Sequence, residues 1–175
     1  MDSKHSSGFT FLELIIVILI LAILSGFAVI TYKKMAASSE LERYAWNVWK
    51  DLTGVRPQVM KYDKQCKVRF KNKSYLIDRA TKVDTIKLPA NIGFAIAKSG
   101  PSKDPFGRSI PVDSGGKSNW KDSLVVKRDA IGTINEGYVS ISSSRLEKIT
   151  YFIGIYGTLQ SIVIYKWTGT SWVKL

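Results

Sequence analysis

Residues 8–34 have the sequence GFTFLELIIVILILAILSGFAVITYKK, and residues 9–30 of this stretch form one long apolar run. The run contains 22 residues, and a helix of that length is about 33 Å long at 1.5 Å per residue. Because the hydrocarbon core of a bilayer is about 30 Å thick, the run predicts a helix that crosses a membrane once. Glu13 is the one charged residue in it.

Glu13 lies where a carboxylate is costly. On insertion scales a charged residue near the middle of an apolar helix costs about 2.5–3.5 kcal/mol, so it is expected to have a partner or a function. The nearest basic residues are Lys4 upstream and Lys33 and Lys34 downstream, all more than two helical turns away along the chain. We therefore expect the partner of Glu13 to come from another chain or from a terminus created by processing.

A short polar leader ending in Gly8, then Phe9, then Glu13 and an unbroken apolar run is similar to the signature of type IV prepilins and type II secretion pseudopilins. The resemblance implies that a prepilin peptidase cuts between Gly8 and Phe9 and that Phe9 becomes an N-methylated amino terminus. It also implies a hetero-oligomeric filament with other pilins or pseudopilins, in which Glu13 meets the terminal amine of a neighbouring subunit and fixes the axial register. The alternative is an uncleaved signal anchor that contains a glutamate.

This interpretation divides the chain into four parts. They are a leader at residues 1–8, a transmembrane and filament-core helix at 9–36, an amphipathic helix at 37–62 and a β-rich globular domain at 63–175. The apolar run is too long for a conventional secretory signal peptide, so the anchor should persist in the mature protein.

The orientation of the anchor is predicted differently by a general rule and by the resemblance. Lys33 and Lys34 outnumber Lys4, so the positive-inside rule alone would place the carboxyl-terminal domain in the cytoplasm. The resemblance implies that this domain lies outside the cytoplasm, in the periplasm, and we follow it because its motif is more specific. The single-pass subunit is then expected in the lipid of the bacterial inner membrane before assembly and in the filament afterwards.

Beyond residue 32 the helix is expected to continue as an amphipathic one. Its apolar residues form one helical stripe, which should lie against the globular domain. The stripe consists of Leu41, Tyr44, Ala45, Val48, Trp49, Leu52 and Val55. Pro57 is expected to end the clean apolar pattern or to kink the helix. Trp46 lies off the stripe and is either a contact for a neighbouring subunit or simply an exposed side chain.

From Cys66 onward the apolar period becomes two. Cys66, Val68 and Phe70 alternate with basic residues, so a strand here would bury the first set and place the basic set on the other face. The basic set is Lys67, Arg69, Lys71 and Lys73. Residues 72–74 are typical of a hairpin turn before a second strand at 75–77. Residues 56–82 carry nine Lys or Arg and two Asp, a net +7 of the whole chain's +12.

The rest of the chain favours strands joined by turns. Residues 99–119 are rich in Pro, Gly and Ser and predict an irregular connection. Later segments rich in β-branched or aromatic residues predict strands at 123–126, 137–142, 149–155 and 161–167. The sequence thus predicts an α+β, pilin-like fold in which the long N-terminal helix packs on an antiparallel β-sheet. The order of elements and a glycine-turn hairpin near residue 157 resemble the GspH/FimT group of minor pseudopilins and minor pilins.

The resemblance implies a structural function, that of a minor subunit which enters a type II secretion pseudopilus or a type IV pilus and helps to initiate its assembly. DNA binding is the alternative, because some FimT-type members capture DNA for uptake. The candidate residues for DNA or another anion are Lys67, Arg69, Lys71, Lys73, Lys166 and Lys174, with Trp167 and Trp172 as candidate stacking residues.

The basic residues also fit explanations other than DNA binding. They fit a solvated sheet face, a strand edge protected from aggregation, anionic lipid headgroups or an acidic neighbouring subunit. In FimT-type binders the DNA contact is attributed to the carboxyl-terminal region, whereas the densest charge here lies earlier. We therefore favour the solvated face over DNA.

The composition excludes several kinds of chemistry. Cys66 is the one cysteine, so no intrachain disulfide can form, and we expect it to be a small core residue. The one histidine, His5, lies in the leader, which excludes the usual zinc sites and Ser-His or Cys-His nucleophiles from the mature chain. Residues 116–118, Gly-Lys-Ser, resemble the end of a phosphate-binding loop, but Pro111 stands where that loop requires a glycine. We expect no catalytic site, no metal site and no cofactor.

Overall fold

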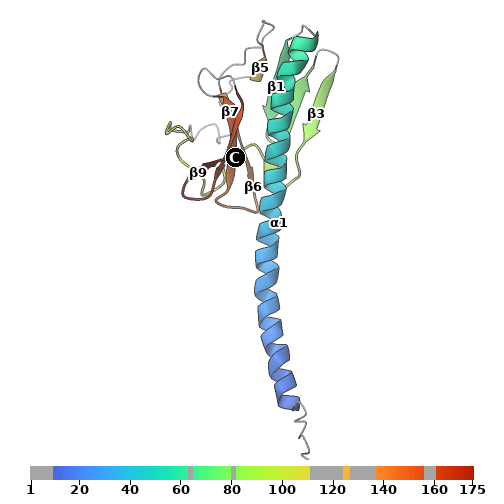
Figure 1. Cartoon of the computed structure of the whole chain (residues 1–175), viewed down its shortest axis with the longest axis vertical. Helices are drawn as coiled ribbons and strands as arrows, with labels where there is room; N and C mark the ends of the chain where they lie inside the picture. The colour runs from blue at the N-terminus through green and yellow to red at the C-terminus, as the bar shows by residue number, and fades with distance from the viewer. Residues whose placement is uncertain (1–9, 63–64, 80–81, 111–123, 127–136, 156–160) are drawn as a thin grey trace, which may run out of the picture. The chain divides into compact units, whose positions relative to one another are not determined.

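The structure is a computed structural model of the chain (Figure 1), and it describes residues 10–62, 65–79, 82–110, 124–126, 137–155 and 161–175. The chain forms two compact units, Met1–Ala36 and Ala37–Leu175. One helix, α1 (Phe11–Tyr62), contributes residues to both units, and all the described strands belong to the second.

The described part of the first unit is dominated by the apolar half of α1. Residues 11–36 are all exposed, and the most apolar 18-residue window of α1 has a mean hydropathy of 3.1 with none of its residues buried. By length and composition this helix can cross a membrane. Ser25 and Thr31 donate their hydroxyls to main-chain carbonyls one turn earlier, at 2.6 and 3.1 Å. Ser25 and Thr31 are the only hydroxyl residues among residues 11–31, so every hydroxyl of this stretch is hydrogen-bonded within the helix.

The second unit contains two antiparallel sheets. Sheet A has the strand order β3-β2-β1-β5 and consists of β1 (Cys66–Lys71), β2 (Ser74–Asp78), β3 (Val83–Lys87) and β5 (Leu124–Val126). Sheet B has the order β4-β6-β7-β8-β9 and consists of β4 (Ile92–Gly93), β6 (Gly137–Ser143), β7 (Thr150–Ile155), β8 (Val163–Trp167) and β9 (Trp172–Lys174).

The predicted α+β layout of a long helix on antiparallel strands is confirmed, but the strands form two sheets where one was expected. The segments predicted as strands at 123–126, 137–142, 149–155 and 161–167 correspond to β5, β6, β7 and β8. The sequence does not predict β4 and β9, which have two and three residues and are too short to show a period. Two segments lie outside the described residues: the hairpin expected near residue 157, and residues 116–118, which resemble the end of a phosphate-binding loop.

The core of the second unit lies between the amphipathic half of α1 and both sheets (Figure 1). The buried residues of α1 form one stripe: Ala37, Leu41, Ala45, Val48, Leu52, Val55 and Val59. Their main partners are Val68, Tyr75 and Ile77 of sheet A and Val139, Ile141, Tyr151 and Ile153 of sheet B. Tyr44 and Trp49 pack at the border of this core, so all seven residues of the predicted stripe contribute to it.

Pro57 does not end α1, which continues to Tyr62. Val55 and Val59, on either side of the proline, are buried at 0% and 2% exposure. The helix therefore runs through the proline to Tyr62, the residue at which the expected amphipathic helix also ends. We attribute the continuation to this packing, which offsets the loss of one main-chain hydrogen bond.

Two carboxylates of α1 join the helix to the two sheets. Glu42 accepts hydrogen bonds from the Tyr151 hydroxyl at 2.7 Å and from the Lys166 ammonium at 3.0 Å, both in sheet B. Asp51 accepts one from the Tyr75 hydroxyl in sheet A. Burial raises the pKa of Tyr75 and of Tyr151, and the bond to the carboxylate raises it further, so both hydroxyls keep the proton that they donate.

A second apolar cluster lies on the other face of sheet B. The rings of Tyr138 and Phe152 stack with their centroids 4.3 Å apart, and Ile110 packs with them. Residues 99–110, the described part of the expected irregular connection, contain a single bridge, between Lys103 and Ser109, and no regular strand.

Candidate functional site

Glu13 is hydrogen-bonded by the residue that precedes α1. Thr10 donates its main-chain N–H at 2.9 Å and its hydroxyl at 3.0 Å to Glu13 Oε2, and the Glu13 N–H donates to Thr10 Oγ1 at 3.2 Å. This reciprocal pattern is a capping box, which satisfies donors that the start of a helix leaves unpaired. Glu13 therefore has a hydrogen-bond partner within its own chain in addition to the partner expected from another chain or from a processed terminus, but Thr10 carries no charge that would neutralise the carboxylate. The Thr-x-x-Glu spacing in the sequence was the signal that could have revealed this capping box.

The carboxylate of Glu13 is only partly satisfied by Thr10. Both bonds from Thr10 reach Oε2, and Oε1 has no hydrogen-bond partner among the residues that the structure describes. No basic side chain within the described ranges forms an ion pair with it. The side chain is exposed, so one oxygen and the negative charge remain accessible to another chain. Gly8 and Phe9, on either side of the expected cleavage point, lie outside the described residues.

β1 buries one face and exposes basic side chains on the other. Cys66 and Val68 are buried at 2% and 0% exposure, and burial raises the pKa of the Cys66 thiol, as expected of a core residue. Lys67, which lies between these two residues, is exposed, and so are Arg69 and Lys71, which follow them. Side chains two residues apart on a strand are about 6.6 Å apart, so these three form a regular basic row.

The pairing of the strands adds a fourth basic residue to this row. Lys71 lies opposite Ser74 of β2, and Ser74 lies opposite Lys87 of β3, so Lys71 and Lys87 share one face of sheet A. Arg69 forms an ion pair with Asp78 at 3.7 Å, and both groups are about half exposed. Such an exposed pair is weak and leaves Arg69 accessible. We call Lys67, Arg69, Lys71 and Lys87 the basic face of sheet A.

Lys73 lies outside this face. It is in the two-residue turn between β1 and β2, and its ammonium donates to Ala90 O at 2.7 Å and to Ile92 O at 2.9 Å. The predicted hairpin turn is present, with β2 beginning at Ser74. Because a turn interrupts the alternation of a strand, Lys73 does not continue the row that ends at Lys71.

Lys166 and Lys174 belong to sheet B and not to the basic face of sheet A. Lys166 donates to Glu42, and its ammonium lies 5.5 Å from the centroid of the Tyr151 ring. The hydroxyl of Tyr151 and the ammonium of Lys166 hold the pKa of Glu42 below its usual range, so Glu42 stays ionised opposite Lys166. Lys174 is exposed on β9. Lys166 is therefore engaged in the contact between α1 and sheet B.

The two candidate stacking residues are packed within the domain. The rings of Trp167 and Trp172 lie 5.4 Å apart between centroids, and Trp172 lies 5.7 Å from Phe152. Trp172 also donates its Nε1–H to Lys103 O at 3.0 Å. Both tryptophans are half-buried, so stacking on nucleic-acid bases would require them to leave these contacts.

An apolar helix with a capped glutamate in its first turn, which continues as an amphipathic helix packed on antiparallel sheets, is the layout of type IV pilin-like proteins. Residues 3–29 match the family model described as the prokaryotic N-terminal methylation motif. No curated protein and no solved structure matches the chain significantly. The motif supports a pilin-like or pseudopilin-like protein and implies processing by a prepilin peptidase and assembly with pilin-type partners, and together with the apolar helix it indicates membrane anchoring as in pilins. This class is structural rather than enzymatic.

Proposed function

We propose that this protein is a minor subunit, of the GspH/FimT type, of a type II secretion pseudopilus or a type IV pilus, and that it helps to initiate filament assembly. Prepilin peptidase cuts between Gly8 and Phe9, and Phe9 is N-methylated. Residues 9–36 hold the subunit in the bacterial inner membrane, with residues 37–175 in the periplasm. The observation that carries this proposal is the apolar run at residues 9–30, which is exposed throughout residues 11–30 and whose one charged residue, Glu13, lies inside the matched residues 3–29.

The chemistry of Glu13 explains why such a helix would retain a charge. Cleavage after Gly8 gives Phe9 a positively charged amine. In a filament, Glu13 is surrounded by the apolar helices of neighbouring subunits. Oε1 of Glu13, which the bonds from Thr10 leave free, can then accept a hydrogen bond from the Phe9 amine of a neighbour. A buried charge pair is tolerated only where both groups meet, so the pair selects one axial register.

Replacing Glu13 with glutamine should block incorporation into the filament without blocking insertion or cleavage. Glutamine has nearly the same size and can still accept the bonds from Thr10, but it carries no charge to pair with a neighbouring amine. We expect at least about a tenfold lower amount of the subunit in isolated filaments, because breaking a buried pair leaves the other charge uncompensated. The amount is measured by immunoblot and normalised to the membrane fraction.

Glu40→Gln is the matched control for this measurement. Glu40 is on the same helix but in the globular unit, where it accepts a hydrogen bond from Asn91 at 3.1 Å. This variant should incorporate as the parent does. Parental incorporation of Glu13→Gln would overturn the proposed assembly role, and a loss of cleavage in that variant would assign Glu13 to processing instead.

DNA binding is a second candidate function, favoured by the basic face of sheet A. This face presents four exposed basic side chains, three of them about 6.6 Å apart along β1, a spacing that can follow a phosphate backbone. It differs from the set that the sequence suggested, because Lys87 joins the row and Lys73 and Lys166 are bonded elsewhere.

Changing Lys67, Arg69 and Lys71 together to glutamate should strongly weaken DNA binding if this face contacts phosphates. The full chain in non-ionic detergent is titrated with duplex DNA at several salt concentrations. We expect the slope of log affinity against log salt to fall by about 2 to 3, because each lost phosphate contact removes about 0.9. Changing the exposed Lys50, Lys61 and Lys148 to glutamate alters the net charge equally and should keep most of the slope. Equal losses of DNA affinity in both variants would show that the effect comes from the overall charge and not from the basic face of sheet A.

A further inference from the structure

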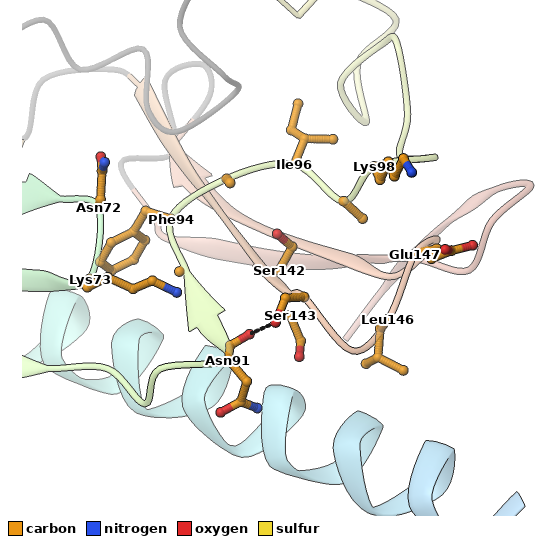
Figure 2. A pocket seen from close by; sticks show the side chains of 14 residues that line it. Asn72, Lys73, Asn91, Phe94, Ile96, Lys98, Ser142, Ser143, Leu146 and Glu147 are labelled. Carbon is orange, nitrogen blue, oxygen red and sulfur yellow. Dashed lines mark hydrogen bonds between the residues drawn. The ribbon is translucent and has the colours of Figure 1, made fainter. Parts of the chain in front are cut away.

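A pocket of about 550 Å³ lies where the two sheets meet (Figure 2). Three segments that are distant in the sequence form its wall: the β1–β2 turn at residues 72–73, β4 with the residues after it at 91–98, and the end of β6 with its turn at 142–147. Asn91 joins two of these segments, because its carbonyl accepts the Ser144 N–H at 2.8 Å. The pocket is unrelated to Glu13 and to the basic face of sheet A.

The ammonium of Lys73 is fixed in the wall of this pocket. Two of its three N–H groups are used by the carbonyls of Ala90 and Ile92, at 2.7 and 2.9 Å. The third has no acceptor, and no carboxylate lies within ion-pair distance, among the residues that the structure describes. A Cβ added at Gly93 would lie 3.4 Å from the Lys73 nitrogen, so the ammonium sits directly against β4. The pocket therefore holds a positioned positive charge that no carboxylate of the described residues pairs with.

Further hydrogen-bond donors line the same pocket. The main-chain N–H groups of Ala95 and Ile96 have no acceptor within the described part of the chain. Ser143 accepts the Arg145 N–H at 3.3 Å through its Oγ, and its own O–H has no acceptor among the residues that the structure describes. Fixed donors of this kind bind an anion with little loss of conformational entropy, because they are ordered before it arrives.

One acidic side chain limits the charge that the pocket can accept. Glu147 lines it together with Lys98, and Figure 2 shows these two on the side away from Asn72 and Lys73. The ionisable side chains among the described residues of the lining are two lysines, Lys73 and Lys98, and one glutamate, Glu147, which together carry a net charge of +1. One carboxylate neutralises that charge, whereas a phosphate dianion would leave an excess negative charge in the pocket. One positioned ammonium with neutral donors beside it suits a single negative charge.

We propose that this pocket binds a carboxylate, with the Lys73 ammonium as the ion-pair partner and neutral donors beside it. The carboxylate belongs either to a small organic acid or to an acidic side chain presented by another polypeptide. The site is independent of the proposed filament function.

Binding is tested on the full chain in non-ionic detergent, with amide chemical shifts measured by NMR. The probes are sodium acetate and the peptide acetyl-Gly-Glu-Gly-amide, against sodium chloride and acetyl-Gly-Gln-Gly-amide. We expect saturable shifts at Gly93, Ala95 and Ile96 with a carboxylate probe and none with its control. Shifts from acetate alone would assign the site to small acids, and shifts from the glutamate peptide alone would assign it to a polypeptide. Equal shifts from probe and control, or shifts confined to β1, would overturn the proposal.

Two substitutions with opposite expected effects on the affinity for a carboxylate test the electrostatics of the pocket. Lys73→Gln should weaken carboxylate binding by about tenfold or more, because it removes the charged donor. Glu147→Gln should strengthen binding by about twofold, because it removes a like charge at the edge of the site. Lys71→Gln, which removes a lysine two residues away on the outer face of β1, should leave the affinity unchanged.

Glu147→Gln keeps the proposal testable if Lys73→Gln misfolds. Lys73→Gln also removes two bonds to main-chain carbonyls, whereas the side chain of Glu147 forms no hydrogen bond within the described residues, and its main-chain carbonyl accepts the Ser99 N–H at 2.8 Å. If Lys73→Gln does not fold, Glu147→Gln decides. A weaker or unchanged affinity in Glu147→Gln would overturn the proposal, as would parental affinity in a folded Lys73→Gln.

Discussion

Replacing Gly8 with leucine should leave the eight-residue leader on essentially every copy of the protein. Residues 3–29 match the N-terminal methylation motif, and the proposed cut falls between Gly8 and Phe9. Glycine has no side chain, so a peptidase can approach its backbone closely, and a branched side chain at this position blocks that approach. Intact-mass measurement of the membrane-extracted chain should show the full length in the variant and a chain starting at a methylated Phe9 in the parent.

Ser6→Leu is the matched control, because it places the same side chain two residues earlier in the leader. We expect this variant to be cleaved as the parent is. Cleavage of Gly8→Leu to the parental extent would show that the cut does not depend on this glycine. A parent that keeps its leader in a host with an active prepilin peptidase would support the uncleaved signal anchor instead.

Replacing Ile77 with alanine should lower the free energy of unfolding by about 2–5 kcal/mol. Ile77 is fully buried in β2 and packs in the core that the amphipathic half of α1 shares with both sheets. The substitution removes three carbon atoms and leaves a cavity where the helix meets sheet A, so both the transfer free energy and the packing are lost. The change is measured by urea unfolding of the full chain in non-ionic detergent, followed by tryptophan fluorescence.

Leu76→Ala is the control for Ile77→Ala, since Leu76 is the adjacent residue on the opposite face of the same strand. It lies opposite Arg69 and Thr85, and it is half-buried rather than part of the core. We expect a loss of about 1 kcal/mol or less, in line with substitutions away from the core. Similar losses for the two variants would contradict the register of β2, because a shift by one residue exchanges the two faces of a strand.

Much of the fold could be predicted because it depends on residues that are near one another in the sequence. The apolar run at residues 9–30 and the stripe from Leu41 to Val55 are periodic patterns, and the structure places both in α1. The alternation from Cys66 to Lys71 likewise gave β1 and its two faces. Local rules gave two outcomes at Pro57, because they do not include the packing of Val55 and Val59 on either side of it.

The candidate site was predicted in part for the same reason. The Thr10–Glu13 capping box spans three residues and could have been predicted from its spacing. Lys87 could not be assigned to the basic face from a local pattern, because it reaches that face only through β2. Lys73 follows the period of β1 in sequence, yet the turn redirects it to the carbonyls of Ala90 and Ile92.

The hydropathy and period of neighbouring residues were enough to define the apolar helix, the amphipathic stripe and several strands, and the motif around Gly8 and Glu13 was identified from its resemblance to prepilins. The folded structure alone divided the strands between two sheets and formed the pocket at their junction. It also paired Glu42 with Lys166, which are 124 residues apart, and so removed Lys166 from the free basic residues. Such contacts arise only when distant segments pack together, and no local period encodes which strand lies beside which.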